Sequence, residues 1–387
     1  MRFKPSIFGQ LLAPLDRVGV AAIAERHDGE AYVKSFDSHD HLLVAIFAQF
    51  SGSSSLRGIE AEWNAHGQHH YHLGTGPVAR STLADANRRR PAAIFAEVFA
   101  GLAGRLDGRT RREGEALLRI IDATPIPLGS LCDWARSNGR IRGLKLHVVF
   151  DPERDCPRVL DITDATVNDI EVGRQLRLER GAVYTFDKAY CHYGWWAAIA
   201  AAGASFVTRP KTSMRLALLA PRSLSATQGK GFEVIEDVEV RLASKGDSRL
   251  PIPLRRLRVR RDEGGEITLL TSDMARSAVE IATLYKGRWQ IELLFRWLKQ
   301  NLRIRRFLGH HPNAIRIQIF AAMIAYALVR IAARSHRAPQ TILRYTQLIA
   351  CCLFERRTLS AIEQPPPIHP HQRQPNSPPA QLRLAYT

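Results

Sequence analysis

The chain has 387 residues, 45% of them hydrophobic, which is enough apolar material for two or three domains and excludes a disordered protein. There are 55 lysines and arginines against 37 aspartates and glutamates, so the net charge is +18. Because this basic excess is spread along the chain and no run of about 18 apolar residues exists, we expect a polyanionic partner and no membrane.

The cysteines and the start of the chain indicate a cellular compartment. Five cysteines are odd in number and none stands at Cys-x-x-Cys spacing, which indicates neither a disulfide framework nor a zinc site. The first residues lack the apolar core of a signal peptide. We therefore expect a cytoplasmic protein.

Residues 1–110 are expected to form a helical DNA-binding domain. An apolar segment at 42–50 is followed by serines, of which Ser54 or Ser55 can cap the next helix. Ser81 can cap a third helix that ends in the basic cluster Arg88–Arg90. The alternative for this cluster is that it only complements the negative end of its helix. Four histidines between 66 and 72 have no cysteine or carboxylate at metal spacing beside them, so we expect solvated loop residues there.

From about residue 114 the pattern changes to that of an α/β protein, and residues 111–210 are expected to begin the catalytic core. The expected strands and helices are strands 116–122, 144–150 and 157–163, helix 169–179, strand 182–187, a helix through 195–201 and strand 204–208. This order is that of the ribonuclease-H-like mixed sheet, in which the first and fourth strands are neighbours. Both end in an acid, so Asp122 and Asp187 should meet, whereas either alone would read as an ordinary turn residue.

Residues 211–270 are expected to be a β-strand insertion. Segments 232–240 and 254–260 alternate with period two, and the second carries arginines on one face. Segment 266–271 is expected to return to the core. The arginine face is either a solvated charged surface or a contact for a DNA backbone, and the alternation does not decide between them.

The second part of the core, residues 271–335, is expected to contain one helix that starts at Ser277 or a neighbouring residue and carries Tyr285 to Lys299. At about 100° per residue, Tyr285, Arg288, Glu292 and Lys299 project within an arc of about 60°. An ordinary surface ion pair between Arg288 and Glu292 is the alternative reading of this face.

Helix 314–333 is expected to pack in the core. A helical segment at 336–363 and a disordered, proline-rich tail at 364–387 complete the chain.

Three carboxylates, Asp122, Asp187 and Glu292, would suit a pair of Mg²⁺ ions about 4 Å apart, because Mg²⁺ prefers hard oxygen ligands. Such ions activate a water or a 3′ hydroxyl for in-line attack on a phosphodiester. In this reading Arg288 and Lys299 hold a phosphate, and Tyr285 donates a further hydrogen bond.

The same residues resemble the DDE transposases of bacterial insertion sequences, in the IS-four group, whose signature is Y-x2-R-x3-E-x6-K. All four positions of that signature match, at Tyr285, Arg288, Glu292 and Lys299. Segments 121–124 and 186–190 resemble the motifs of the first and second acids, although Ala123 replaces the usual serine and Ala189 stands where glycine is common. Some relatives stack a flipped base on a tryptophan of the β insertion, and residues 211–270 contain none.

The resemblance implies a transposase that binds terminal inverted repeats as a dimer, cleaves the element ends and joins 3′ hydroxyls to target DNA. Mg²⁺ is the implied cofactor, with Mn²⁺ as a substitute, and double-stranded DNA of the bacterial nucleoid is the implied partner. Two alternatives stay open. One is a DNA-binding descendant without catalysis, and the other is a ribonuclease-H-like nuclease that does not transpose.

Overall fold

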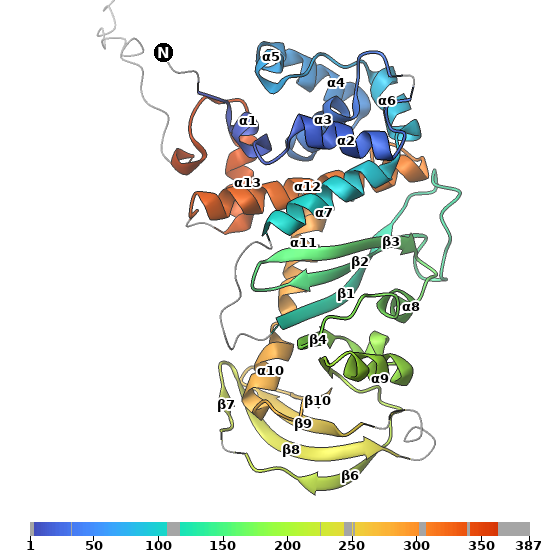
Figure 1. Cartoon of the computed structure of the whole chain (residues 1–387), viewed down its shortest axis with the longest axis vertical. Coiled ribbons are helices and arrows are strands. Elements are labelled where there is room, and N and C mark those ends of the chain that lie inside the picture. Colours follow the sequence, from blue (N-terminus) through green and yellow to red (C-terminus); the bar gives the residue numbers. More distant parts are fainter. Residues whose placement is uncertain are drawn as a thin grey trace, which may run out of the picture.

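The computed structural model describes residues 4–31, 33–106, 117–224, 226–243, 250, 252–301, 307–338 and 341–362. Figure 1 shows three parts in a column, with a helical body at one end, a mixed sheet with its covering helices in the middle, and a β extension at the other end. The expected disordered tail at 364–387 lies outside the described residues, as do 107–116.

The helical body contains the first seven helices of the chain. They are α1 (Ile7–Leu12), α2 (Arg17–Arg26), α3 (Ser38–Phe50), α4 (Leu56–Ala65), α5 (His70–Leu73), α6 (Arg80–Arg89) and α7 (Ala92–Leu106). Ser55 caps α4 as predicted, because its side chain accepts a hydrogen bond from the Gly58 amide. The prediction that Ser81 caps α6 is wrong. That helix begins at Arg80, so Ser81 lies inside it. The Glu60 carboxylate accepts a hydrogen bond from the Arg80 amide at 3.0 Å.

The expectation of a solvated histidine loop is also wrong. His70 is 5% exposed and stacks on Trp63 with ring centroids 4.8 Å apart. His66 stacks on Phe354 at 3.9 Å. These two rings pack the helical body against itself and against the carboxyl-terminal segment.

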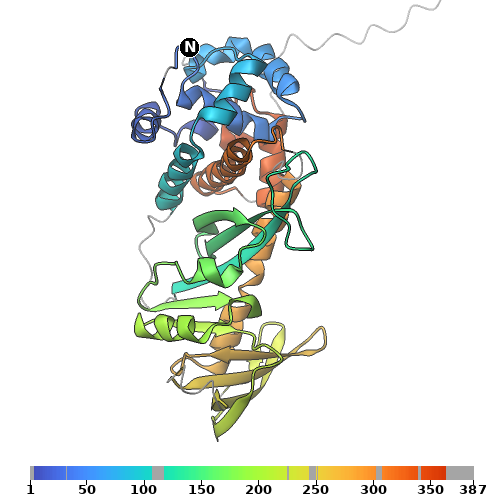
Figure 2. The same ribbon diagram turned by 90° about the vertical axis from the view of Figure 1, so that its right-hand side faces the viewer.

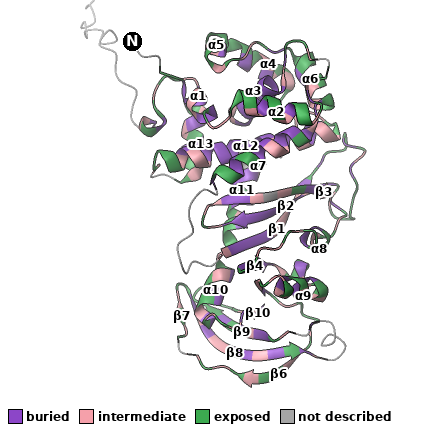
Figure 3. Cartoon of the chain, viewed as in Figure 1, coloured by how far each residue is buried: buried purple, intermediate pink, exposed green. Residues whose placement is uncertain are grey.

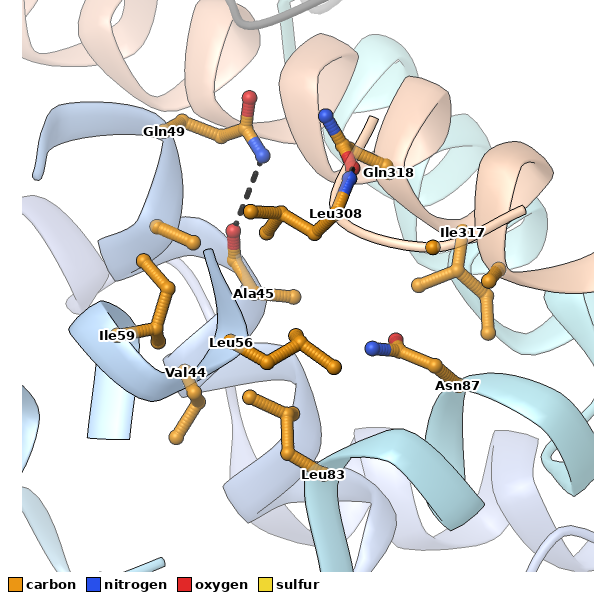
Figure 4. A pocket seen from close by; sticks show the side chains of 13 residues that line it. Val44, Ala45, Gln49, Leu56, Ile59, Leu83, Asn87, Leu308, Ile317 and Gln318 are labelled. Atoms are coloured by element: carbon orange, nitrogen blue, oxygen red, sulfur yellow. Dashed lines mark hydrogen bonds between the residues drawn. The ribbon is translucent and has the colours of Figure 1, made fainter. Parts of the chain in front are cut away.

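Two later helices, α12 (Pro312–Ser335) and α13 (Ile342–Cys351), belong to the same helical body. α12 is long and apolar enough to cross a membrane, but 83% of its apolar window is buried inside the protein, so it is the core helix that we expected. A small cavity of about 20 Å³ lies where α3, α4 and α6 meet α12. Figure 4 shows Leu56, Leu83 and Ile317 among the side chains around it.

One mixed sheet of ten strands runs through the rest of the chain. Its strands are β1 (Leu117–Pro127), β2 (Gly143–Asp151), β3 (Cys156–Asp164), β4 (Ala182–Phe186), β5 (Ser205–Thr208), β6 (Leu216–Pro221), β7 (Gln228–Gly229), β8 (Phe232–Leu242), β9 (Leu254–Arg261) and β10 (Glu266–Thr271). The order is β3-β2-β1-β4-β5-β10-β9-β8-β6, with β7 paired to β8. β1, β2 and β3 are antiparallel, whereas β1, β4 and β5 are parallel. The predicted ribonuclease-H-like arrangement is therefore confirmed.

Helices cover both faces of the sheet centre. The helices α10 (Ala278–Lys286) and α11 (Trp289–Asn301) lie along one face, as Figure 2 shows from the side. The helices α8 (Asp169–Gly173) and α9 (Tyr193–Ala201) lie on the other. Successive side chains of a strand point to opposite faces. Accordingly, Ile120 packs in the core that contains α11, and Ile121 packs in the core that contains α9.

Three expected boundaries differ from the structure. The single helix expected from about Ser277 to Lys299 is two helices, because the chain turns at Gly287 and Arg288. The first of them starts directly after its N-cap Ser277, as predicted. A Cβ at Gly287 would lie 3.1 Å from the Leu284 carbonyl oxygen and 3.4 Å from the Leu118 side chain, so the turn relies on glycine to approach β1. The helix expected at 169–179 ends at Gly173. β1 continues to Pro127, which places Asp122 within the strand and not at its end.

The arginines of the β extension are paired with acids on the neighbouring strands. Arg255, which is 1% exposed, binds the Asp237 carboxylate at 2.5 and 3.1 Å. On the outer face of β9, ion pairs at 2.6–3.5 Å join the arginines to glutamates of β8 and β10. These pairs are Arg256–Glu236, Arg258–Glu236, Arg258–Glu266, Arg260–Glu233 and Arg260–Glu266. This face is a charged surface whose arginines already have partners.

Candidate active site

The strand register brings Asp122 and Asp187 together. β1 and β4 pair in parallel with Ile121 opposite Phe186, so the next residue on each strand is an acid. Neighbouring strands are about 4.8 Å apart, which makes these two carboxylates neighbours across the sheet. Asp187 directly follows β4, and its side chain accepts the Ala189 amide at 2.6 Å. That hydrogen bond fixes the second acid at the end of its strand.

The pleat of the sheet points both acids toward α11. Asp122 has the same parity as Ile120, and Asp187 has the same parity as Val183; both of these hydrophobic residues pack in the core that contains α11. Glu292 lies in the first turn of α11. The fold therefore brings the three predicted acids to one place, from two parallel strands and one helix.

Arg288 joins two of the acids. Its guanidinium contacts Asp122 Oδ2 at 3.2 Å through Nη1 and Glu292 Oε1 at 2.6 Å through Nη2. The ion pair between Arg288 and Glu292 that the sequence offered as an alternative is thus present. The reading of Arg288 as a phosphate clamp in place of that pair stays a prediction, because the structure contains no DNA. Arg288 also contacts Asp122 of β1, so the three residues form one charged cluster.

Asp122 is hard to ionise in this position. Burial, together with the negative charges of Asp187 and Glu292, raises the pKa of Asp122 to about 6, against the lowering effects of the Ala123 amide and Arg288. Burial also works to lower the pKa of Arg288, but its interactions with Tyr285 and with the carboxylates of Asp122 and Glu292 outweigh it, so that pKa is raised. Both pKa values are raised, which favours the charged form of Arg288 and disfavours the charged form of Asp122. The arginine is therefore firmly charged, whereas the charge of Asp122 is only partly neutralised, because Arg288 is shared with Glu292.

Tyr285 and Lys299 are placed differently. Tyr285 is 8% exposed at the end of α10, and its ring lies 5.9 Å from the Arg288 guanidinium carbon. It therefore packs against the arginine at the site. Lys299 is half-buried seven residues beyond Glu292 on α11, which at 1.5 Å per residue is about 10 Å along the helix. The structure thus brings Tyr285 to the acids, and it places Lys299 two turns away.

Sequence reasoning missed Arg209, which the same register argument would have found. β4 and β5 pair in parallel with Thr185 opposite Val207, so Asp187 lies level with Arg209 two residues further on. Arg209 also lines a cavity of about 320 Å³ between α10, α11 and the β extension, together with Tyr285, Arg288 and Glu292. The signal was a charged residue directly after the fifth predicted strand, at the edge where the acids were expected.

The acids fit a divalent cation by their donor chemistry. Asp122, Asp187 and Glu292 offer hard oxygens, and among the described ion pairs Arg288 is their shared cation, so negative charge is left over. Asp37, His39 and Asp40 form a second group with metal-like spacing at the start of α3. There Asp37 caps the helix and pairs with Arg17 at 2.6 Å, and the positive end of the helix opposes a cation. For this reason the three acids beside α11 remain our predicted metal site.

Comparisons with known proteins found similar sequences and one similar fold. Residues 113–328 match the family model of the transposase DDE domain, and residues 4–76 match a domain of unknown function, DUF4372. A putative transposase, y4zB, from Sinorhizobium fredii is 64% identical over 304 residues, covering 79% of this chain and 85% of that protein. The probable transposase of insertion sequence element IS5377 from Geobacillus stearothermophilus is 30% identical over 253 residues, covering 65% and 66%. The piggyBac transposase synaptic complex with hairpin DNA is similar at a TM-score of 0.46, with 10% identity and coverage of 94% of this chain and 81% of that chain.

Proposed function

Since the chain belongs to the DDE transposases of insertion sequences, we propose that it binds the terminal inverted repeats of its own element, cleaves the ends and joins 3′ hydroxyls to target DNA. The observation that supports this most strongly is the meeting of Asp122, Asp187 and Glu292, of which Asp122 and Glu292 share Arg288 and Asp187 has no described ion pair. In a cluster that only stabilises the fold, the negative charges of the carboxylates would be balanced by cationic side chains. In a site for divalent cations, negative charge is left in excess.

In this proposal Asp122, Asp187 and Glu292 hold Mg²⁺, with Mn²⁺ as a substitute. The metal supplies Lewis-acid stabilisation of the phosphate charge and lowers the pKa of the attacking hydroxyl or water. The protein contributes the fixed positions of its oxygens, which come from two paired strands and the first turn of a packed helix. Such preorganisation is what in-line phosphodiester attack requires.

The cations beside the acids are proposed to hold the DNA backbone. If Asp122 and Glu292 held a divalent cation, the Arg288 guanidinium that contacts them here would be available to bind a phosphate, with Tyr285 supporting its plane. Arg209, level with Asp187, would bind a phosphate of the same strand. Lys299, two turns along α11, would contact the backbone further from the cleaved bond. DNA would thus lie along α11.

Several further features belong to the same proposal. Residues 1–110 are assigned to recognition of the ends, and residues 111–210 and 271–335 to catalysis, with 211–270 as the inserted β subdomain and 336–363 as a helical support. Two copies would pair the two ends of one element in a synaptic dimer. The protein would act on nucleoid DNA in the bacterial cytoplasm.

The test is cleavage and strand transfer in vitro, on duplexes that carry the element end, with Mg²⁺. We expect Asp187→Asn or Glu292→Gln to reduce cleavage by at least about 10³-fold without loss of end binding, because an acid that holds the metal cannot be replaced by an amide. Asp161→Asn is the matched control, since this acid lies exposed on β3 of the same sheet. Normal cleavage by either site variant would show the assignment to be wrong.

The same assay separates the two alternatives. An unsubstituted protein that shifts end DNA in gels but never nicks it with Mg²⁺ or Mn²⁺ is a DNA-binding descendant without catalysis. A protein that nicks DNA but never joins a 3′ hydroxyl to a target is a nuclease that does not transpose.

A further inference from the structure

Helix α6 presents one polar face to solvent. Leu83 is 3% exposed and anchors the helix, whereas six of its residues are exposed (Figure 3). At about 100° per residue, five of those six project within an arc of about 120°. They are Ser81, Thr82, Asp85, Arg88 and Arg89. This face carries hydroxyl, carboxylate and guanidinium groups and no large apolar side chain.

The arginines of this face differ from three other arginines of the helical body, Arg17, Arg26 and Arg90. Arg26 pairs with Glu97, and Arg17 pairs with Asp37. Arg90, at the end of α6, is 5% exposed and donates to the carbonyls of Phe36, Asp37 and Gly29. In the part of the chain that the structure describes, no ion pair or hydrogen bond involves the side chain of Arg88 or Arg89. Their positive charge is not compensated within the protein.

The opposite face of α6 is held firmly. His41 hydrogen-bonds the Asn87 side chain at 3.0 Å. Asn313, at the start of α12, donates to the carbonyls of Asn87 and Arg90 at 2.9 and 2.7 Å and accepts from the Ala92 amide at 3.1 Å. A helix that is fixed from behind and polar in front can offer its side chains to a partner with little loss of conformational entropy.

A groove of about 500 Å³ runs beside this face. It lies between α6 and the segment 28–36, and its walls include Lys34, Ser35, Thr82, Asp85 and Arg89. Lys34 is exposed, and no described ion pair involves it. A cation at the edge of a polar helix face is where a phosphate of bound DNA would lie when the helix enters a groove of the duplex.

We propose that α6 is the helix that reads the sequence of the element end, in the major groove. Arg88 and Arg89 supply the bidentate donors that suit guanine, and Asp85 is an acceptor that suits the amino group of cytosine. Ser81 and Thr82 can contact either, and Lys34 binds the backbone. This inference rests on the proposed function, because it requires that the protein recognise the ends of its own element.

The experiment is fluorescence anisotropy of the full chain with two labelled duplexes of equal length, one carrying the terminal inverted repeat and one carrying the same bases scrambled. We expect Arg88→Ala/Arg89→Ala to weaken binding to the repeat by about 10- to 100-fold and binding to the scrambled duplex much less. Arg88→Lys/Arg89→Lys keeps the charge but not the bidentate geometry, so it should retain scrambled binding and still lose preference for the repeat.

Arg26→Ala is the matched control, because this arginine is exposed on α2 and already paired with Glu97. It should leave both affinities unchanged. Thermal melts should show that the α6 variants are folded. A double alanine variant that keeps the preference for the repeat, or that loses both affinities equally, would overturn the assignment of α6. If the unsubstituted protein does not prefer the repeat at all, the proposed function fails and this inference fails with it.

Discussion

Two clusters of acids and arginines in this protein look alike by composition but differ in their balance. On β8 and β9, Asp237 faces Arg255, and Glu236 faces Arg256 and Arg258. Beside α11, Asp122 and Glu292 share Arg288, and among the described ion pairs Asp187 has none. Buried charge is costly unless it is paired, so a cluster that serves only the fold is expected to balance itself. The surplus of negative charge marks the cluster that serves a ligand.

The largest effect that tests this comparison is expected at the buried pair of the β extension. Arg255→Met would leave the buried Asp237 carboxylate with only the distant Arg222, at 3.9 Å, and would remove the donor to the carbonyls of Asp273 and Arg276. We expect a loss of about 3–5 kcal/mol in the free energy of unfolding, measured by chemical denaturation. Arg255→Met/Asp237→Leu removes both charges and should recover much of that loss. A single variant as stable as the unsubstituted protein would contradict the structural role of this pair.

A smaller effect on the free energy of unfolding, a gain and not a loss, is expected at Asp122 in the candidate active site. The folded protein raises the pKa of Asp122 from 3.8 to about 6, so its ionised form costs stability above pH 6 and nothing below about pH 4. Asp122→Asn should therefore stabilise the metal-free protein at pH 7.5, by on the order of 2 kcal/mol. The gain should shrink as the pH falls from 6 to 4. Melts in EDTA across this range would measure it, and destabilisation at pH 7.5 would show that the Arg288 contact outweighs burial.

The smallest effect is expected on the outer face of β9. Arg258 pairs with Glu236 and Glu266, but all three side chains are substantially exposed. Exposed ion pairs contribute little because water screens them and ordering the side chains costs entropy. Arg258→Gln should leave the melting temperature unchanged within error, and end binding as well, since this arginine already has acidic partners. Reduced affinity for DNA in this variant would restore the β9 face as a DNA contact.

Much of the fold and of the site could be predicted from the sequence, because strand order and side-chain alternation are properties of short segments. Three strands followed by helix, strand, helix and strand predicted the neighbours β1 and β4, and with them the meeting of Asp122 and Asp187. The spacing of Arg288 and Glu292 predicted that they share a face, and their ion pair joins the turn before α11 to the first turn of that helix. The turn at Gly287 was not visible, since a glycine within a helical pattern is usually tolerated.

The fate of each arginine could not be predicted, because it depends on partners that are distant in sequence. Arg89 and Arg90 are adjacent, yet one is exposed and the other binds three carbonyls of the segment before α3. Arg258 finds Glu236 only through the register of β8 and β9. The start of α6 was missed for the same reason, since Glu60 accepts the first amide from another helix. The sequence shows where basic residues occur, but the tertiary contacts decide whether their positive charge is available to a ligand.

The side-chain amide of Asn313 helps to fix the distance between the proposed recognition helix α6 and the proposed cleavage site. It ties the end of α6 and the start of α7 to the beginning of α12, the next described helix after α11, which carries Glu292. Under the two proposals, the base pairs that are read and the phosphodiester that is cut are then held at opposite ends of one rigid frame. The position of the cut would be counted from the recognised sequence in whole base pairs. Loosening this amide would blur the count, so that ends are cut at neighbouring positions while the chemistry itself continues.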